Sequence, residues 1–192
     1  MTTLSPWLIV GLGNPGAEYE RTRHNIGAMC SDLLADRAHS GFSRHKRSNA
    51  DLAECRIGVQ RVVLAKPRSF MNTSGGPVKA LADFFKVPLD RLVVLHDELD
   101  LPFAAQRYKQ GGGDNGHNGL KSIRASLGSG DFLRVRLGIG RPPGRQDPAD
   151  FVLRAFATAE RAELPTFLAR AADGIEALIS DGLVAAQNGW ND

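Results

Sequence analysis

Short apolar runs alternate along the chain with stretches in which apolar residues recur every three or four positions. The runs at 8–10 and 92–95 are uninterrupted and rich in β-branched residues, which is typical of strands buried on both faces. Residues 132–138 instead alternate with a period of two, which places Arg134 and Arg136 on one face of a strand. Further strands are predicted at 52–59, 62–64 and 106–109.

Helical spacing predicts the other layer of the molecule. One apolar face runs from about Asn25 to Arg37, and a second helix begins near Pro77 and turns Phe84 and Phe85 toward the core. A third helix opens in the glycine-rich stretch 111–120. The last helix spans Thr158 to Ser180, with Thr158 as its candidate cap. Strands that alternate with helices predict an α/β fold.

Length and composition are those of one ordinary globular domain. The chain has 192 residues, of which 42% are hydrophobic and 23% charged, so we expect a single domain over 1–192. Within it, 141–150 is a candidate lid loop and 183–192 a C-terminal tail. The net charge of +3 permits a polyanionic partner without requiring one.

The apolar pattern also bears on where the protein works. No apolar run reaches the length of a membrane span, and no secretory pattern precedes the first strand, so we expect a cytoplasmic protein without a membrane association. Cys30 and Cys55 fit buried, reduced thiols better than a disulfide framework, and neither has the spacing of a metal site.

The first strand runs into a Gly/Asn/Pro loop, 11–16, and then into His24 at the start of the first helix. The positive end of a helix disfavours imidazolium, so this position predicts a neutral histidine that could accept a proton. A histidine that only completes a helix turn is the more common situation.

The same loop matches the dinucleotide-binding pattern G-x-G-x-x-G at 11–16. Pro15 and the polar run 18–23 delay the helix that should begin inside the loop, and no acid ends a second strand about 20 residues later. Dinucleotide binding, and with it a nicotinamide-dependent oxidoreductase, is therefore a weak alternative.

A second polar cluster follows the strand 92–95, where His96, Asp97 and Glu98 stand at its carboxyl end. Such a cluster could ligate a metal, perform acid–base chemistry or form a solvated turn; the metal option lacks other clustered ligands. Asp97 is well placed to hydrogen-bond His24, to fix its tautomer and to stabilise its imidazolium form.

Uncharged amides complete this set of loops, since Asn14, Asn72 and Asn118 all follow strands or begin helices. A base, a carboxylate that orients it and three amides suit hydrolysis of an acyl ester or amide by an activated water. The sequence contains no Gly-x-Ser-x-Gly elbow and no suitably exposed thiol, so water is the expected nucleophile.

Five motifs in register resemble those of bacterial peptidyl-tRNA hydrolases, from about Trp7 to the last helix. They are Gly-Leu-Gly-Asn-Pro-Gly at 11–16, Thr-Arg-His-Asn at 22–25, Phe-Met-Asn at 70–72 with Ser74 and Gly75, His-Asp-Glu-Leu-Asp-Leu-Pro at 96–102, and Gly-His-Asn-Gly-Leu at 116–120. The resemblance implies a monomeric α/β hydrolase with a twisted mixed β-sheet surrounded by helices. It implies no metal or other cofactor and no obligate protein partner. It also implies cleavage of the ester between a peptide and the 3′-terminal ribose of tRNA, which recycles tRNA from prematurely released peptidyl-tRNA.

The resemblance also implies roles for individual residues. His24 would activate water, Asp97 would support it, and Asn14 would help to distinguish a blocked peptidyl amine from a free one. The remaining positions would bind substrate: Asn72 and Asn118 the peptide backbone and terminal adenosine, Tyr19 and Phe70 the tRNA end, Met71 the cleft, and Lys109 and Arg136 the tRNA phosphates.

The chain departs from the family pattern at a few positions. Asp114 and Asn115 stand where a His-Gly pair is more usual, and Ser69 where threonine is. An acid at 114 could weaken tRNA binding slightly. A noncatalytic RNA-binding relative of the same fold is the alternative function.

Overall fold

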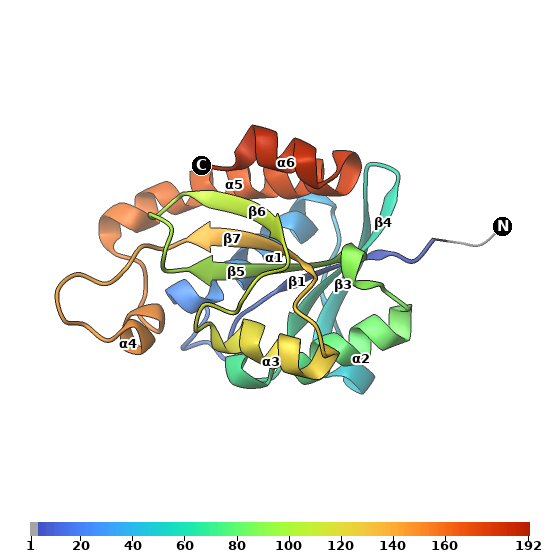
Figure 1. The fold of residues 1–192 in the computed structure, drawn as a ribbon, viewed down its shortest axis with the longest axis horizontal. Helices are drawn as coiled ribbons and strands as arrows, with labels where there is room; N and C mark the ends of the chain where they lie inside the picture. Colours follow the sequence, from blue (N-terminus) through green and yellow to red (C-terminus); the bar gives the residue numbers. More distant parts are fainter. Residues whose placement is uncertain (1–3) are drawn as a thin grey trace.

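A seven-stranded sheet forms the centre of the molecule, and Figure 1 shows it between two layers of helices. The computed structural model describes residues 4–192. The strands are, in spatial order, β2 (Ser43–His45), β3 (Ala50–Ile57), β4 (Gln60–Pro67), β1 (Trp7–Gly11), β5 (Leu92–Glu98), β7 (Leu133–Gly138) and β6 (Gln106–Gln110).

The sheet is mixed, which confirms the architecture implied by the family resemblance. β4, β1, β5 and β7 run parallel to one another, whereas β2, β3 and β6 each lie antiparallel to a neighbour. The carboxyl ends of the four parallel strands therefore share one edge of the sheet. In open α/β sheets, this edge is where loops converge on a ligand.

Within residues 4–192 the α-helices are α1 (Ile26–Arg37), α2 (Gly75–Phe85), α3 (Asn118–Leu127), α4 (Pro148–Val152), α5 (Thr158–Asp181) and α6 (Leu183–Trp190). In Figure 1, α5 and α6 lie on one side of the sheet and α2 and α3 on the other. Ile9 and Val93 belong to the apolar cluster under α1 and α5, and Leu8 and Val94 to the cluster under α2 and α3. The central strands are thus buried on both faces, as their unbroken apolar runs predicted.

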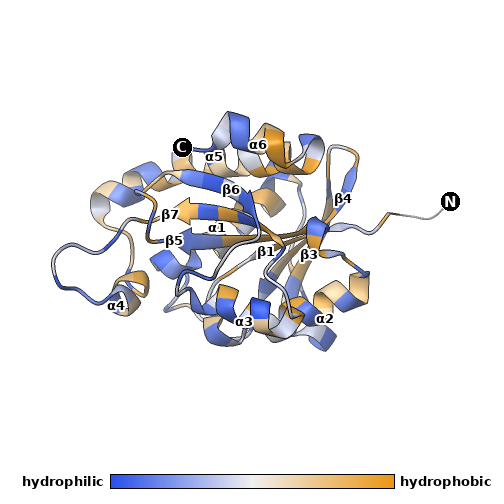
Figure 2. Cartoon of the chain, in the orientation of Figure 1, coloured by the Kyte–Doolittle hydropathy of each residue, from blue (hydrophilic) through white to orange (hydrophobic). Residues whose placement is uncertain are grey.

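The alternating strand β7 also matches its prediction. Figure 2 shows hydrophobic and hydrophilic positions in turn along β7. Arg134 and Arg136 line one cavity, while Val135 is completely buried in the core on the other face.

Three local predictions were wrong. The Phe84 side chain is 48% exposed and lies edge-to-face on His45, which belongs to β2, an edge strand for which no strand was predicted. Thr158 does not cap α5: Ala157 holds the cap position, and its backbone N–H donates to Glu160 Oε1 over 2.8 Å. The strand predicted to end at Leu95 continues to Glu98, which brings the polar cluster into the sheet.

Residues 183–192, predicted as a tail, contain α6, and the backbone N–H of Asp192 donates to the backbone carbonyl of Gln106 in the edge strand β6.

Both cysteines are free. Cys30 is buried, as expected, and burial raises the pKa of its thiol to about 12. Cys55 is only half-buried. Among residues 4–192, no helix has the length and apolarity needed to cross a membrane.

Candidate active site

His24 is placed by the loop that links β1 to α1. It lies in a short 3₁₀ turn, η1 (Arg23–Asn25), directly before α1 begins at Ile26. The delay of the helix beyond the glycine-rich loop, expected from Pro15 and the polar run, is therefore confirmed. Gly27 allows α1 to approach β5, because a Cβ at this position would overlap the Leu95 carbonyl. This close approach brings η1 beside the carboxyl end of β5.

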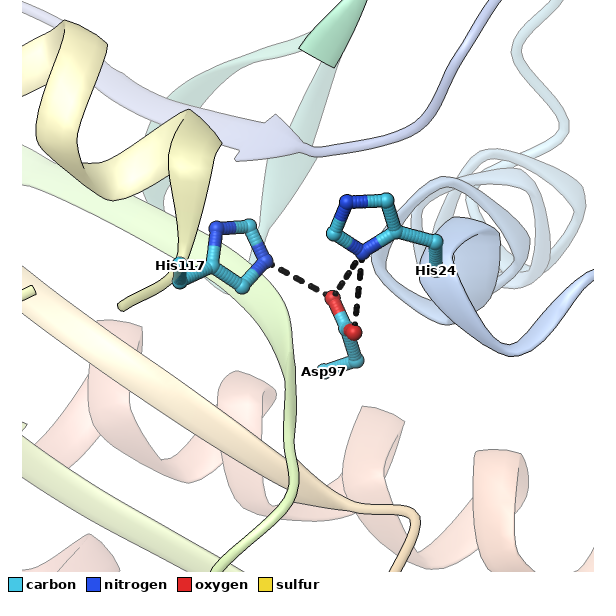
Figure 3. Close-up of side chains that lie close together, drawn as sticks. All are labelled: His24, Asp97 and His117. Atoms are coloured by element: carbon cyan, nitrogen blue, oxygen red, sulfur yellow. Dashed lines mark hydrogen bonds and ion pairs between the residues drawn. The ribbon is translucent and has the colours of Figure 1, made fainter. Parts of the chain in front are cut away.

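The predicted hydrogen bond between His24 and Asp97 is present. Nδ1 of His24 lies 3.0 Å from Oδ1 and 2.9 Å from Oδ2 of Asp97, and both residues are buried. Figure 3 shows the second ring nitrogen of His24 on the side of the ring away from the carboxylate. Because Nδ1–H donates to Asp97, Nε2 carries the lone pair that can accept a proton.

His117 is the functional residue that the sequence reasoning missed. Its Nε2 lies 2.7 Å from Oδ1 of Asp97, as Figure 3 shows, and its Nδ1 accepts the backbone N–H groups of Gly119 and Leu120 as the cap of α3. An Nδ1 that accepts two N–H groups carries no proton, so the proton of the neutral ring resides on Nε2. Asp97 therefore receives one N–H from each of two histidines.

These contacts set the charge of the pair. Burial alone would lower the pKa of His24, but the negative charge of Asp97 and its hydrogen bond outweigh burial and raise that pKa above 6.5. The contact with Asp97 therefore acts against the effect expected of the helix end, which favours the neutral form of His24. Burial would raise the pKa of Asp97, yet the charge of His24 and the hydrogen bonds from both imidazoles hold it below its usual range.

A third imidazole closes the network from behind. His96 is buried and lies edge-to-face on His117, with ring centroids 5.2 Å apart. Its Nδ1–H donates to the backbone carbonyl of Asp97 over 2.8 Å, and burial lowers its pKa to about 3. His96 thus stays uncharged and adds no positive charge to the pair in front of it.

His24, Asp97 and His117 also place three potential metal-ligand atoms within 4.8 Å of one another. The hydrogen-bond pattern fits this use poorly. Nε2 of His117 would have to lose its proton to bind a metal while its Nδ1 still accepted two N–H groups, which requires an imidazolate ring. The arrangement fits a carboxylate bridging two N–H donors better than a metal centre.

Three amides surround the exposed side of His24. Asn14, Asn72 and Asn118 line a cavity of about 220 Å³ together with His24 and Met71. A neighbouring cavity of about 140 Å³ is lined by Asp97, and His24 and Asn118 border both cavities. The structure therefore gathers six of the predicted site residues at one edge of the sheet.

Asn14 is fixed by its surroundings. Its Oδ1 accepts the backbone N–H of Met71 over 2.7 Å, while the side chain of Asn25 bonds both the N–H and the carbonyl of Asn14. With Oδ1 occupied, the Nδ2 group is the part of the side chain left for a ligand, and it can only donate. Asn25 stands next to His24 in the motif, so its position was a usable signal that the sequence reasoning did not weigh.

Lys109 and Arg136 lie away from this centre, in a cavity of about 480 Å³ beside β6 and β7. Arg136 is bound to Glu98: its Nε donates to Oε1 over 2.9 Å, and its Nη2 contacts the same oxygen. Arg134, at the back of the cavity, donates to the backbone carbonyls of Gly112, Gly113 and Gly130. Arg136 is the only one of the three cations with a carboxylate partner among residues 4–192, and since Arg134 is held by backbone carbonyls, Lys109 is the cation left without a bonding partner there.

Tyr19 and Phe70 form an edge-to-face pair with ring centroids 6.2 Å apart, and the Phe70 side chain is 56% exposed. They extend from the loops after β1 and β4 and do not line the cavity around His24.

Asp114 and Asn115, which depart from the family pattern, both have side-chain partners. Asp114 accepts a hydrogen bond from Arg124 over 3.0 Å, and Asn115 donates one to Asp100 over 2.5 Å. The acid at 114 is therefore already paired.

Comparison with known proteins adds an independent line of evidence. A family model described as "Peptidyl-tRNA hydrolase" matches residues 8–192. The chain is 60% identical to the peptidyl-tRNA hydrolase of Nocardia farcinica over 95% of each chain, and 61% identical to that of Frankia casuarinae over 97% of this chain and 94% of the relative. The crystal structure of peptidyl-tRNA hydrolase from Acinetobacter baumannii superposes with a TM-score of 0.91 at 31% identity, covering 100% of this chain and 99% of the other.

Proposed function

The chain belongs to the peptidyl-tRNA hydrolase family, and we propose that it hydrolyses peptidyl-tRNA with His24 as the base that activates water. The scissile bond is the ester between the peptide and the 3′-terminal ribose of tRNA. The observation that carries this assignment is the hydrogen bond from Nδ1 of His24 to Asp97, which leaves Nε2 as a proton acceptor in a cavity lined by amides. A noncatalytic RNA-binding relative is not favoured by these findings.

The reaction begins when Nε2 of His24 takes a proton from water as the water oxygen attacks the ester carbonyl. Asp97 stabilises the imidazolium that forms, because its charge lies within 3.0 Å of Nδ1. The tetrahedral intermediate then expels the ribose oxygen, which takes the proton back from Nε2. The products are a peptide with a free carboxylate and tRNA with a free terminal hydroxyl, and His24 is regenerated.

The amides bind the parts of the substrate that do not react. Nδ2 of Asn14 donates to a peptide carbonyl, since its Oδ1 is held by Met71. An acylated amine leaves such a carbonyl next to the ester, whereas a free aminoacyl group lacks it, so this contact favours peptidyl over aminoacyl esters. Asn72 and Asn118 line the same cavity and hold the remaining peptide group and the terminal adenosine.

The tRNA phosphates bind on the β6–β7 side, where Lys109 meets them directly and Arg136 exchanges its bond to Glu98 for one to phosphate. Tyr19 and Phe70 offer aromatic faces to the terminal adenosine.

The enzyme acts as a monomer in the cytoplasm. There it recycles tRNA from peptidyl-tRNA that ribosomes release prematurely.

The direct test is the release of free tRNA from N-acetyl-aminoacyl-tRNA, measured for the wild-type protein and for His24→Ala. The wild type should release tRNA, and His24→Ala should bind the same substrate without releasing it at a comparable rate. A wild-type protein that binds this substrate and releases nothing would support the noncatalytic alternative.

A further inference from the structure

A further cavity lies on the β4 side of the catalytic centre and has no role in the mechanism above. Its volume is about 530 Å³, within the range of about 300–1,000 Å³ typical of ligand pockets. Its walls come from the loop after β1, from α1 and from the end of β4, with Asp32, Lys66 and Arg68 among the charged side chains. Asn14 borders both this cavity and the one around His24.

The cavities form a row along the carboxyl edge of the sheet. The cavity lined by Lys109, Arg134 and Arg136, called the cation cavity below, shares Glu98 and Asn115 with the cavity at Asp97. The cavity at Asp97 in turn shares His24 and Asn118 with the cavity lined by the three amides. Asn14 lines both that cavity and the one beside β4. Since the strand order is β4-β1-β5-β7-β6, the cation cavity and the β4 cavity flank the catalytic centre on opposite sides.

The two flanking cavities differ in charge. The lining of the cation cavity has three cations and two carboxylates, whereas the β4 cavity has three cations and three carboxylates. In the β4 cavity, Lys66 is paired with Asp32 over 2.5 Å and Arg68 with Asp51 over 3.0 Å. A phosphate backbone is attracted by unpaired positive charge, so this balanced lining suits an uncharged polar chain better than RNA.

We propose that the β4 cavity is the subsite for the peptide residues that precede the one esterified to tRNA. This proposal rests on the proposed function, which places the ester at His24 and the tRNA phosphates on the opposite side. The peptide leaves the catalytic cavity past Asn14, whose Nδ2 group donates to a carbonyl of the passing chain. The aromatic pair Tyr19 and Phe70, assigned to the terminal adenosine, does not line the β4 cavity.

The two ion pairs predict that this subsite accepts peptides of either charge. Each pair presents a cation and a carboxylate side by side at a half-exposed position, so either an acidic or a basic peptide side chain finds a partner. Exposed ion pairs of this kind are worth about 0.2–1 kcal/mol, so opening one costs little. The wild-type cavity should therefore show little preference between charged peptides.

Reversing one charge of the Lys66–Asp32 pair should give the cavity a measurable preference for peptides of one charge. Lys66→Glu leaves two carboxylates facing each other and should favour a peptide with lysine over one with glutamate, and Asp32→Lys should reverse that preference. The expected change in the ratio of kcat/KM for the two peptides is about 2- to 5-fold in each direction. The double variant Lys66→Glu with Asp32→Lys restores an ion pair and is the matched control.

The substrates are peptidyl-tRNAs with one to six residues, with lysine or glutamate at the positions upstream of the ester. Only the longer substrates should respond to the charge reversals, and hydrolysis of N-acetyl-aminoacyl-tRNA should stay within about twofold of wild type, because its single residue does not reach the cavity. Circular dichroism of each variant checks that the fold is retained.

Three results would overturn the proposal. The charge reversals could change kcat/KM equally for the one-residue substrate and the longer ones, or they could produce no preference between lysine and glutamate peptides at any length. They could also change the affinity for tRNA without an esterified peptide in a way that depends on salt concentration. The last result would place RNA in the cavity. Failure of the wild-type protein to cleave the one-residue substrate would instead contradict the proposed function itself, so the two failures are distinguishable.

Discussion

The catalytic centre and the cation cavity beside β6 and β7 are both built from charged groups, but their bonding differs. At the centre, Asp97 is buried and accepts one N–H from each of two histidines, and the backbone N–H groups that Nδ1 of His117 accepts fix the tautomer of that ring. In the cation cavity, Arg136 is held by Glu98 and Lys109 lacks a carboxylate partner among the described residues. Replacing a residue of the catalytic centre should therefore lower kcat, whereas replacing a cation of the cation cavity should mainly weaken tRNA binding.

The largest effect is expected at the base itself. His24→Ala should lower kcat for N-acetyl-aminoacyl-tRNA by at least about 10²- to 10⁴-fold, because no other group among the described residues of the cavity offers an imidazole to the attacking water. KM should change little, since the amides and cations remain. Single-turnover kinetics would show this, and wild-type turnover in the variant would remove the mechanism.

A smaller loss is expected when the carboxylate is neutralised. Asp97→Asn keeps an acceptor for one imidazole but removes the charge that stabilises the imidazolium, and kcat should fall by about 10²-fold. Asp97→Glu, which retains the charge but moves it by one methylene, serves as the comparison. Equal activity of the Asn variant and the wild type would mean that the charge of Asp97 is not used.

His117 should affect both catalysis and stability, and two variants separate these effects. His117→Ala removes the cap of α3, which costs about 1 kcal/mol, and also removes the bond to Asp97. His117→Asn supplies another good cap but no second donor to Asp97. We expect the Asn variant to melt near the wild-type temperature while kcat falls about tenfold through misplacement of Asp97. Recovery of both properties would show that His117 is only a cap.

The mildest effects should come from the cation cavity. Lys109→Ala should raise KM for tRNA substrates severalfold, leave kcat nearly unchanged and reduce the slope of log affinity against log salt by about one, as expected for one phosphate contact. Lys79→Ala is the control, since Lys79 lies on α2 and pairs with Asp83 over 3.2 Å. The same slope for Lys109→Ala and wild type would place the phosphates elsewhere.

The two regions also differ in how far the sequence predicts them. His24 and Asp97 each follow a buried parallel strand, and neighbouring parallel strands end at the same edge, so their contact was foreseeable. The partner of Arg136 was not, because β5 extends three residues beyond its apolar run and buried polar side chains leave no periodic signal. The role of His117 depends on how the glycine-rich loop folds before α3, which spacing alone does not fix.

The exposure of Phe84 also could not be predicted from residue spacing. The helical spacing predicted α2 correctly, but the apolar stripe of this helix is wider than the apolar surface of the sheet that it covers. Phe84 therefore lies against His45 of the short edge strand β2, where the spacing predicted contact with the core. Periodicity predicts which face a residue occupies. It does not predict how far the neighbouring layer extends.

The pH dependence of kcat/KM, compared between the wild type and Asp97→Asn, tests the central claim most directly. A base works only when unprotonated, so the wild-type rate should rise with pH through the pKa of His24, which Asp97 raises above 6.5. Without the charge of Asp97, burial dominates, and the midpoint should move to lower pH while the plateau falls. An unchanged midpoint in the variant would contradict the conclusion that Asp97 sets the basicity of His24.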